Sequence, residues 1–258
     1  MSTKIFAVLN QKGGVGKSTI TVNLAYELSL SKKKTLIIDL DPQAHSSCIY
    51  CSEVDNKKSI SQAFQDNRYD ISTLISSAFV LENPQQHLDI IPSSIHLALI
   101  AENASGKLYR ERILKNHLKK IENKYDFILL DCPPTLGILT INAIYAASHI
   151  LIPTNYGKYS LDGIADLLQS IKDIKETDVY HFHILRNLYE RRNSQTNRFV
   201  NLQLEKLNKN LLDTVIRKNE AINQSQINGV PTKIFNSSAA GAHDFEQLKI
   251  ELLGYVAE

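Results

Sequence analysis

The hydrophobic positions of this chain follow two alternating patterns. Short runs of apolar, largely β-branched residues recur along the sequence, and segments with apolar residues every three or four positions separate them. The runs predict buried strands, and the segments between them predict amphipathic helices. This alternation is typical of an α/β fold with a mostly parallel, twisted sheet and helices on both faces. The predicted strands are Ile5–Asn10, Thr35–Asp39, Leu88–Pro92, Phe127–Asp131, His149–Pro153, His181–Asn187 and Thr214–Ile216.

The predicted helices lie between these strands or follow them. Ser52–Gln86 is less regular and rich in Ser, Asp and Asn, so we expect small helices over one edge of the sheet there. There is no internal repeat, and we expect one domain over residues 1–258. The predicted helices are Ser18–Leu30, Leu108–Ile121, Ser160–Ile174, Asn197–Asn208 and roughly Ala242–Val256.

Composition narrows the class of protein. The chain is 43 % apolar and 22 % charged, with a formal charge of +2, as in ordinary globular proteins. No run approaches the ~20 apolar residues of a membrane span. The N-terminal segment shows no signal-peptide pattern, which predicts a cytoplasmic protein. Three cysteines are too few for a disulfide framework.

A glycine-rich loop directly follows the first predicted strand and opens the first predicted helix. It reads Q-K-G-G-V-G-K-S-T and ends as a Walker A motif does, although Gln11 stands at the usual first glycine. Glycines let successive N–H groups turn inward around an anion, and the helix N-terminus adds positive charge. We expect Lys17 to contact the β- and γ-phosphates and Ser18 to ligate Mg²⁺. The predicted nucleotide-binding residues of the loop are Gln11, Lys12, Gly13, Gly14, Val15, Gly16, Lys17, Ser18 and Thr19.

Two predicted strands end in carboxylates, which a phosphate-loop ATPase needs near Mg²⁺ and the attacking water. Asp131 ends an apolar strand and is predicted to hold Mg²⁺ through a water. Asp39 and Asp41 end another strand. We expect Asp41 to orient the attacking water and Asp39 to support the Mg²⁺ shell. An acid after an apolar run is also a common strand end, but its order and spacing after the loop favour the functional interpretation.

Together these motifs resemble the ParA/MinD family of deviant Walker A ATPases, and most closely its Soj-like ParA branch. The resemblance includes N-Q-K-G-G-V-G-K-S-T, I-D-L-D-P-Q-A-H at 38–45, Y-D-F-I-L-L-D-C-P-P at 125–134 and the run from Asp213 to Leu252. It covers nearly the whole chain except Ser52–Gln86. It implies a P-loop NTPase fold and a weak ATPase that uses ATP and Mg²⁺.

The resemblance also implies a reaction cycle. In this family the lysine that matches Lys12 reaches across a homodimer to the partner's nucleotide, so Lys12 joins Lys17 and Asp41 as a predicted catalytic residue. The implied cycle is dimerisation on ATP, non-specific DNA binding by the dimer and hydrolysis stimulated by a ParB-like partner. The ATP-bound protein would then be nucleoid-associated, moving or positioning a plasmid or chromosome.

Two segments depart from the family pattern. Asn155-Tyr156-Gly157 replaces the usual proline after the strand at 149–153, and Ile216-Arg217-Lys218-Asn219 lacks the proline of the family's I-P-R-N. We therefore place the adenine contacts only near Asn187 and Arg217.

Positive charge is concentrated late in the chain, although a charged helix face is more often simply solvated. Doubled in a dimer, it could bind the DNA backbone, with an affinity that falls with salt. The absence of a helix-turn-helix before the loop argues against operator recognition. The predicted DNA contacts are Arg186, Arg191, Arg192, Arg198, Arg217 and Lys218.

Three alternatives remain open. The final segment Asp244–Glu258 is net acidic, which argues against a MinD-like membrane helix. Cys48 and Cys51 have C-x-x-C spacing, but a second pair is missing, so small packed residues explain them better than a metal cluster, as they do Cys132. The same ATP chemistry would also serve a ParA-like ATPase that positions a protein cargo without DNA.

Overall fold

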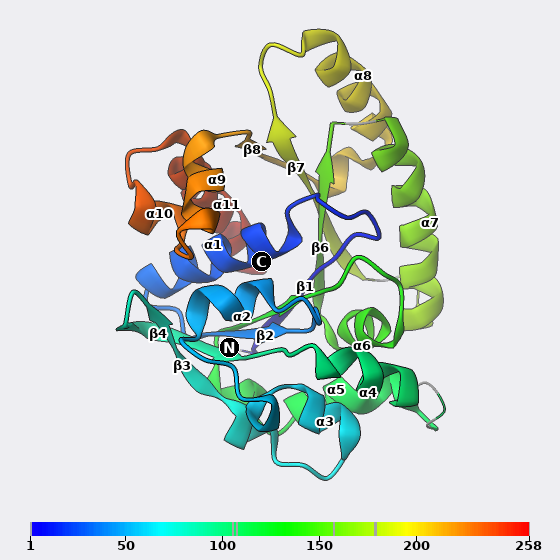
Figure 1. Ribbon diagram of the computed structural model, residues 1–258. Helices are drawn as coiled ribbons and strands as arrows, with labels where there is room; N and C mark the ends of the chain where they lie inside the picture. The colour runs from blue at the N-terminus through cyan, green and yellow to red at the C-terminus, as the bar shows by residue number, and fades with distance from the viewer. Residues whose placement is uncertain (1, 105, 107, 157, 178–179, 258) are drawn as a thin grey trace.

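The computed structural model describes residues 2–104, 106, 108–156, 158–177 and 180–257. Within them, eight strands form one sheet in the order β3-β4-β2-β5-β1-β6-β7-β8 (Figure 1). Neighbouring strands are parallel, except that β3 runs antiparallel to β4. The strands are β1 (Lys4–Val8), β2 (Thr35–Asp39), β3 (Ser76–Val80), β4 (Asn83–Ile91), β5 (Phe127–Asp131), β6 (His149–Asn155), β7 (His181–Tyr189) and β8 (Leu211–Arg217).

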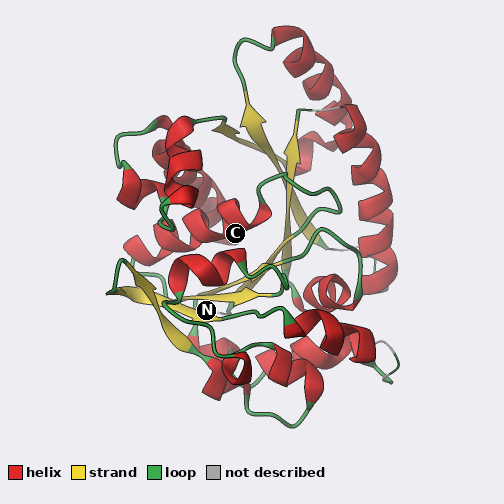
Figure 2. Cartoon of the chain, in the orientation of Figure 1, coloured by secondary structure: helices red, strands yellow, loops and turns green. Residues whose placement is uncertain are grey.

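Helices cover both faces of this sheet (Figure 2), which confirms the predicted α/β class. The α-helices are α1 (Lys17–Leu30), α2 (His45–Tyr50), α3 (Ser61–Gln65), α4 (His96–Ala104), α5 (Ile113–Leu118), α6 (Ile138–Ala146), α7 (Lys158–Lys175), α8 (Ser194–Leu204), α9 (Glu220–Ile227), α10 (Thr232–Phe235) and α11 (Ala240–Ala257). Short 3-10 helices are η1 (Asn56–Lys58), η2 (Ile71–Leu74), η3 (Arg110–Arg112), η4 (Glu122–Lys124) and η5 (Glu205–Asn210).

The strand side chains alternate between two buried layers. On β1, Ile5 and Ala7 pack with α3–α8 on one face, while Phe6 and Val8 pack with α1, α2, α9 and α11 on the other. Because both layers are apolar, the strands are hydrophobic without interruption, as parallel strands buried on both faces are. This packing holds the strand ends rigidly at the two edges where polar side chains gather.

One prediction for the irregular segment was incomplete. Ser52–Gln86 does contain the small helices η1, α3 and η2, but it also supplies β3, and β4 begins at Asn83 rather than at Leu88. The turn between β3 and β4 uses Leu81 and Glu82, both with positive φ (49° and 63°). Such turns normally carry Asn or Gly, so no hairpin could be predicted there.

The prediction of one long helix over Leu108–Ile121 was wrong. Leu108 is 86 % exposed, and Tyr109 adopts a left-handed backbone with φ 54°, so the α-helical part is only α5. Helices α4, α9 and α10 were not predicted; each is short, with nine residues or fewer. Within the described residues, no helix is long and apolar enough to cross a membrane.

Candidate functional site

The glycine-rich loop joins the carboxyl end of β1 to the first turn of α1. Gly14 and Gly16 have φ values of 72° and 88°, the left-handed region that glycine tolerates best. A Cβ atom on Gly16 would lie 2.3 Å from the Asn187 Nδ2 atom, so this position needs glycine for space as well. Asn187 Nδ2 donates to the Val15 carbonyl at 2.8 Å and ties the loop to β7. The loop is therefore a preformed cradle.

A cavity of about 450 Å³ opens over this cradle, a volume typical of a ligand pocket. Most predicted loop residues line it, together with several that the sequence reasoning missed on α2 and beyond β8. Gln11 is exposed, and Val15 is buried beneath the loop. The lining residues are Gly13, Gly14, Gly16, Lys17, Ser18, Thr19, Asp41, Gln43, His45, Cys48, Ile49, Pro134, Gln226 and Gly229.

The two loop lysines point to different places. Lys17 lines the cavity, is 7 % exposed, and donates to the Lys12 carbonyl at 3.2 Å. Burial lowers the pKa of Lys17, against the attraction of Asp131. The Lys12 Nζ atom instead donates to Asn155 Oδ1 at 3.2 Å, outside the nucleotide cavity. Lys17 can thus meet a phosphate within its own chain, whereas Lys12 lies at the rim.

The predicted acids come together at the carboxyl edge of the sheet. Asp131 pairs in register with Val8 on one side and Asp39 on the other, so both carboxylates lie beside the loop. Both are fully buried, and burial raises the pKa of each. Ser47 Oγ donates to Asp39 at 2.7 Å, and Ser46 Oγ donates to Asp131 at 2.6 Å. These two serines, which the sequence reasoning missed, fix the carboxylates.

The carboxylate of Asp131 fits a hard divalent cation. Its Oδ2 atom accepts from Ser46, but its Oδ1 atom is buried without a hydrogen-bond partner. The Ser18 hydroxyl lies close enough to this carboxylate to lower its pKa, against the larger effect of burial. A buried carboxylate oxygen beside a hydroxyl is the oxygen donor set that Mg²⁺ takes next to phosphates. Asp39 has both oxygens occupied by Ser47 and the Asp41 amide, so it supports this site from behind.

Asp41 lines the cavity itself and is 7 % exposed. Its Oδ1 atom accepts from the Gln43 amide at 3.0 Å, and its carbonyl accepts from the Ala44 amide at 2.8 Å. Ala44 has a positive φ of 55°, which turns the chain into α2. Asp41 is therefore held at the cavity by a tight turn.

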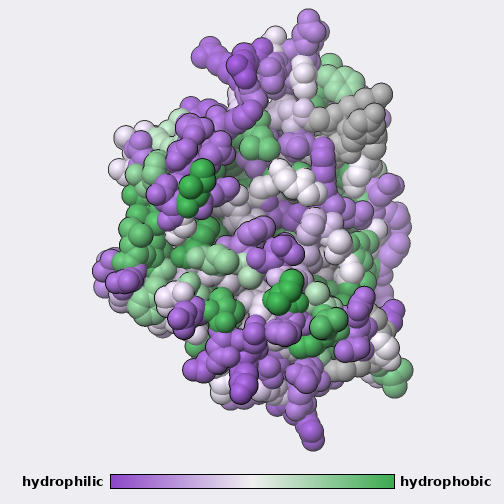
Figure 3. All heavy atoms as spheres, viewed as in Figure 1, coloured by the Kyte–Doolittle hydropathy of each residue, from purple (hydrophilic) through white to green (hydrophobic). Residues whose placement is uncertain are grey.

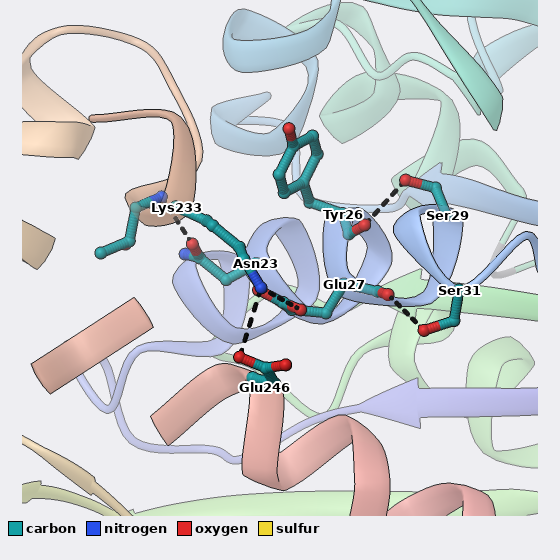
Figure 4. A network of polar contacts seen from close by, with 8 residues as sticks. Asn23, Tyr26, Glu27, Ser29, Ser31, Lys233 and Glu246 are labelled. Atoms are coloured by element: carbon teal, nitrogen blue, oxygen red, sulfur yellow. Dashed lines mark hydrogen bonds and ion pairs between the residues drawn. The ribbon is translucent and has the colours of Figure 1, made fainter. Parts of the chain in front are cut away.

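The far wall of the cavity comes from the C-terminal helices. Gln226 on α9 donates to the Thr19 hydroxyl on α1. Figure 4 shows the network that fixes this wall: Lys233 contacts Glu27 at 3.2 Å and Glu246 at 3.3 Å, joining α10 to α1 and α11. The Glu27 side chain is only 2 % exposed, while Lys233 is 27 % exposed. Sequence reasoning missed this wall because its residues lie some 200 positions from the loop.

Comparison with known proteins agrees with this geometry. A sequence profile for the family described as AAA domain matches residues 3–184. The chain is 31 % identical over 255 residues to the chromosome-partitioning ATPase Soj of Treponema pallidum, covering 97 % of both chains. It belongs to the ParA/MinD family of ATPases. The predicted resemblance is thereby confirmed.

Other relatives extend the agreement over the full length of the ParA-type chain. The sporulation initiation inhibitor protein Soj of Bacillus subtilis is 30 % identical, over 96 % of this chain and 98 % of that protein. The Mycobacterium smegmatis cobyrinic acid a,c-diamide synthase, solved with an ATP analogue and magnesium, has a TM-score of 0.80 at 24 % identity. That match covers 99 % of this chain and 96 % of that one, and it shows a shared fold.

The two predicted adenine contacts of this ParA-type chain have different surroundings. Asn187 lies under the loop, bonded to Val15. Arg217 does not line the cavity, because its guanidinium group pairs with Asp244 at 2.5 Å and also bonds to the Ala240 carbonyl. Neither Asn187 nor Arg217 lines the cavity, so both stay predictions, and Gln226 and Gly229 are better placed to border a base.

Much of the predicted DNA surface is engaged internally. Arg192 and Lys218 both pair with Glu190, and Arg186 donates to the carbonyls of Leu212 and Asp213. Arg191 and Arg198, by contrast, border a cavity of about 420 Å³ beside α8. Figure 3 shows that the projecting end around β7 and α8 is mostly hydrophilic.

The cysteines of this ATPase are free thiols. Cys48 is exposed and lines the nucleotide cavity, Cys51 is half-buried and Cys132 is buried. Burial raises the pKa of Cys51 to about 11. No group of three or more His, Cys, Asp or Glu side chains able to hold a metal ion occurs among the described residues.

Proposed function

We propose that this chain is a ParA-type ATPase that dimerises on Mg-ATP, hydrolyses it slowly and partitions or positions DNA. The observation that carries the proposal is the convergence of Lys17, Ser18 and Asp41 on one cavity at the carboxyl edge of the sheet, with Asp131 buried behind it next to Asp39. Slow turnover follows from an incomplete site, because phosphoryl transfer depends on positioning and charge stabilisation. The whole of residues 1–258 would act as one ATPase domain.

Each site residue has a proposed role. The loop amides and Lys17 hold the phosphates, and Asp41 orients the attacking water. Ser18 and Asp131 would hold Mg²⁺, supported by Asp39; when bound, the ion neutralises charge on the phosphates. The base would lie against the wall that contains Gln226 and Gly229, with Asn187 beneath the loop.

Lys12 has a proposed role between subunits. Its bond to Asn155 holds it at the rim, outside the cavity of its own chain. A second copy facing this rim would receive the ammonium group at its own nucleotide, so ATP would stabilise a homodimer. A ParB-like activator would then accelerate hydrolysis, as the family resemblance implies.

DNA binding is proposed for the dimer, and the ATP-bound protein would be cytoplasmic and nucleoid-associated. Arg191 and Arg198 form the proposed core of the surface, because Arg186, Arg192, Arg217 and Lys218 are already engaged within the chain. Arginines that contact DNA phosphates would give the protein an affinity for DNA that falls steeply as the salt concentration rises and does not depend on the base sequence.

A second candidate function is the positioning of a protein cargo without DNA. The same ion pairs favour it, because they reduce the positive charge available at the late-chain surface. The ATP chemistry would be identical in both cases, so only the surface can separate them.

The test measures binding of the protein to random-sequence duplex DNA, with ADP or with a non-hydrolysable ATP analogue, at two salt concentrations. We expect tight, salt-sensitive binding only with the analogue, and at least tenfold weaker binding for Arg191→Ala/Arg198→Ala. Lys32→Ala/Lys33→Ala is the matched control, because it removes the same charge from the turn after α1. Absence of DNA binding with ATP-dependent dimerisation intact would favour a protein cargo instead.

A further inference from the structure

A second polar cavity lies at the edge of the sheet opposite the nucleotide site. Its volume is about 300 Å³. It forms where β6 and β7 begin, whereas the glycine-rich loop is at the carboxyl edge. The seven residues of β6 separate the two edges by roughly 20 Å. Its walls are Lys115, Tyr145, Ala147, Ser148, Lys175, Thr177, Tyr180 and His181, and we call it the basic pocket.

Two lysines converge on the basic pocket without a carboxylate. Lys115 comes from α5 and Lys175 from the last turn of α7, and Figure 1 shows these helices near α6 on one side of the sheet. Neither lysine makes an ion pair within the described residues. Lys175 donates to the Ala147 carbonyl at 2.7 Å, and Lys115 lies 4.9 Å from the centre of the Tyr145 ring. Both ammonium groups are thus held in place by neutral partners.

The surroundings add one further cation and a stacked pair of histidine rings. Arg112 lies 5.6 Å from the same Tyr145 ring. Behind Ser148, the His149 ring stacks on His181 at 5.1 Å, and Ser148 Oγ bonds to His149 Nδ1 at 2.9 Å. Burial and the neighbouring Lys115 lower the pKa of Lys175 to about 8. A group of like charges held this closely costs free energy unless an anion offsets it.

We propose that the basic pocket binds a small phosphorylated ligand at a site separate from the nucleotide site. Lys115 and Lys175 supply two point charges for a dianionic phosphate, as lysines do in phosphate sites. Ser148 lies in the same walls with its hydroxyl already bonded to Ile5 and His149, and Tyr145 and Tyr180 form aromatic sides for the rest of the molecule. The volume suits a compact metabolite. The proposal does not depend on the DNA-partitioning function, because none of these residues belongs to the nucleotide cavity.

The experiment measures binding of inorganic pyrophosphate by calorimetry at pH 7, with protein saturated by ADP in the absence of magnesium. ADP fills the glycine-rich loop, so pyrophosphate must bind elsewhere. We expect one site per chain, at least tenfold weaker binding for Lys115→Gln, and no detectable binding for Lys115→Gln/Lys175→Gln. Because Lys115 is exposed, its single variant should fold even if the double variant does not.

The matched control is Lys119→Gln, at the end of the same helix but outside the basic pocket. It should bind pyrophosphate as the wild type does. Equal affinities for Lys115→Gln and Lys119→Gln would overturn the proposal. So would loss of pyrophosphate binding in Lys17→Ala, since the anion would then occupy the glycine-rich loop.

Discussion

The two edges of the sheet differ in how their charges are organised. At the carboxyl edge, buried carboxylates on β2 and β5 face a lysine and a glycine-rich loop, and serines bond to each acid. At the amino edge, lysines and histidines gather around the basic pocket with no ion pair to Lys115 or Lys175 among the described residues. The cavity at the first edge combines both signs of charge, as a site for Mg²⁺ and phosphates requires, whereas the described lining of the basic pocket contains lysines and no carboxylate.

This difference shows what kind of ligand each edge can accept. A nucleotide with its metal needs cations and anions arranged together, and the cavity at the carboxyl edge has both, whereas the described lining of the basic pocket has no carboxylate. The excess positive charge of the basic pocket can be offset by an anion that binds from solution. The substitutions below separate the edges, since each should affect one edge and leave the other unchanged.

The largest expected effect is that of Lys17→Ala on ATP affinity. Lys17 is the buried cation of the cavity, and its loss removes the point charge proposed for the β- and γ-phosphates. We expect the dissociation constant for ATP to rise at least ~100-fold, about 3 kcal/mol. Calorimetry with ATP measures this directly, and unchanged affinity would refute the role of the loop.

The same variant also tests the separation of the edges. Lys17→Ala should bind pyrophosphate at the basic pocket as well as the wild type does. Lys175→Gln provides the reciprocal control, and its ATP affinity should be unchanged. If either substitution lowered the affinity for both ATP and pyrophosphate, the two sites would be coupled.

The next largest expected effect is that of Asp131→Asn on the thermal stabilisation of the ADP complex by Mg²⁺. The wild type should gain thermal stability when Mg²⁺ is added to its ADP complex, and the variant should lose this gain, because a neutral amide replaces the carboxylate beside Ser18. The activation free energy for ATP hydrolysis should rise by about 2–3 kcal/mol, so turnover should fall roughly 30- to 150-fold.

Without ligands, Asp131→Asn should be slightly more stable than the wild type. Asp131 Oδ1 is buried without a partner and the carboxylate lies next to Asp39, so removing its charge removes a desolvation cost of about 1 kcal/mol. Ser46→Ala is the matched control, since it removes a bond to Asp131 but keeps the charge. An undiminished magnesium response in Asp131→Asn would exclude this carboxylate from the metal site.

The carboxyl edge could be predicted from the sequence because its chemistry lies in short continuous motifs. Lys17 and Ser18 are adjacent, and Asp39 and Asp131 each end an apolar run. Parallel pairing then necessarily brings strand ends to one edge. The same reasoning predicted the strand set except β3, whose turn at Leu81 and Glu82 carries no glycine signal.

The remaining parts could not be predicted because they depend on contacts between distant segments. Gln226 meets Thr19 across 207 positions, and Lys233 meets Glu27 across 206. The basic pocket combines Lys115, Ser148 and Lys175 from different elements, and none of these residues stands in a motif. The neutralisation of Lys218 by Glu190 likewise appears only once β7 and β8 are packed together.

A third prediction concerns the histidines behind the basic pocket. Burial lowers the pKa of His149 and His183 to about 4, from 6.5. The unfolded chain therefore binds more protons between these values, so the free energy of unfolding should fall as the pH drops from about 6.5 to 4. Each histidine should contribute about 2 kcal/mol to that loss.

His149→Phe tests this contribution, because phenylalanine can keep the stack on Phe6 but cannot be protonated. Urea unfolding at pH 7 and pH 4.5 should show a smaller loss of stability for this variant than for the wild type. His243→Gln, an exposed position, is the control and should lose as much as the wild type. Equal losses of unfolding free energy in the wild type and both variants would show that protonation of His149 does not destabilise the fold.

The smallest expected effect is that of Lys115→Gln on the titration of Lys175. The folded-state pKa of Lys175 is about 8, below its ordinary 10.5, because of burial and of Lys115. Between these pH values the unfolded chain holds more protons, so this lysine's contribution to stability rises as the pH rises through 8. Removing the Lys115 charge should raise the Lys175 pKa and so narrow the pH range over which this contribution changes. Lys119→Gln should leave the Lys175 pKa unchanged.

The Lys175 side-chain resonance, followed by NMR between pH 6 and pH 11, would report the change in its pKa. An identical midpoint in Lys115→Gln and wild type would mean that burial alone lowers this pKa, and the amino edge would then lack the like-charge repulsion that distinguishes it from the carboxyl edge.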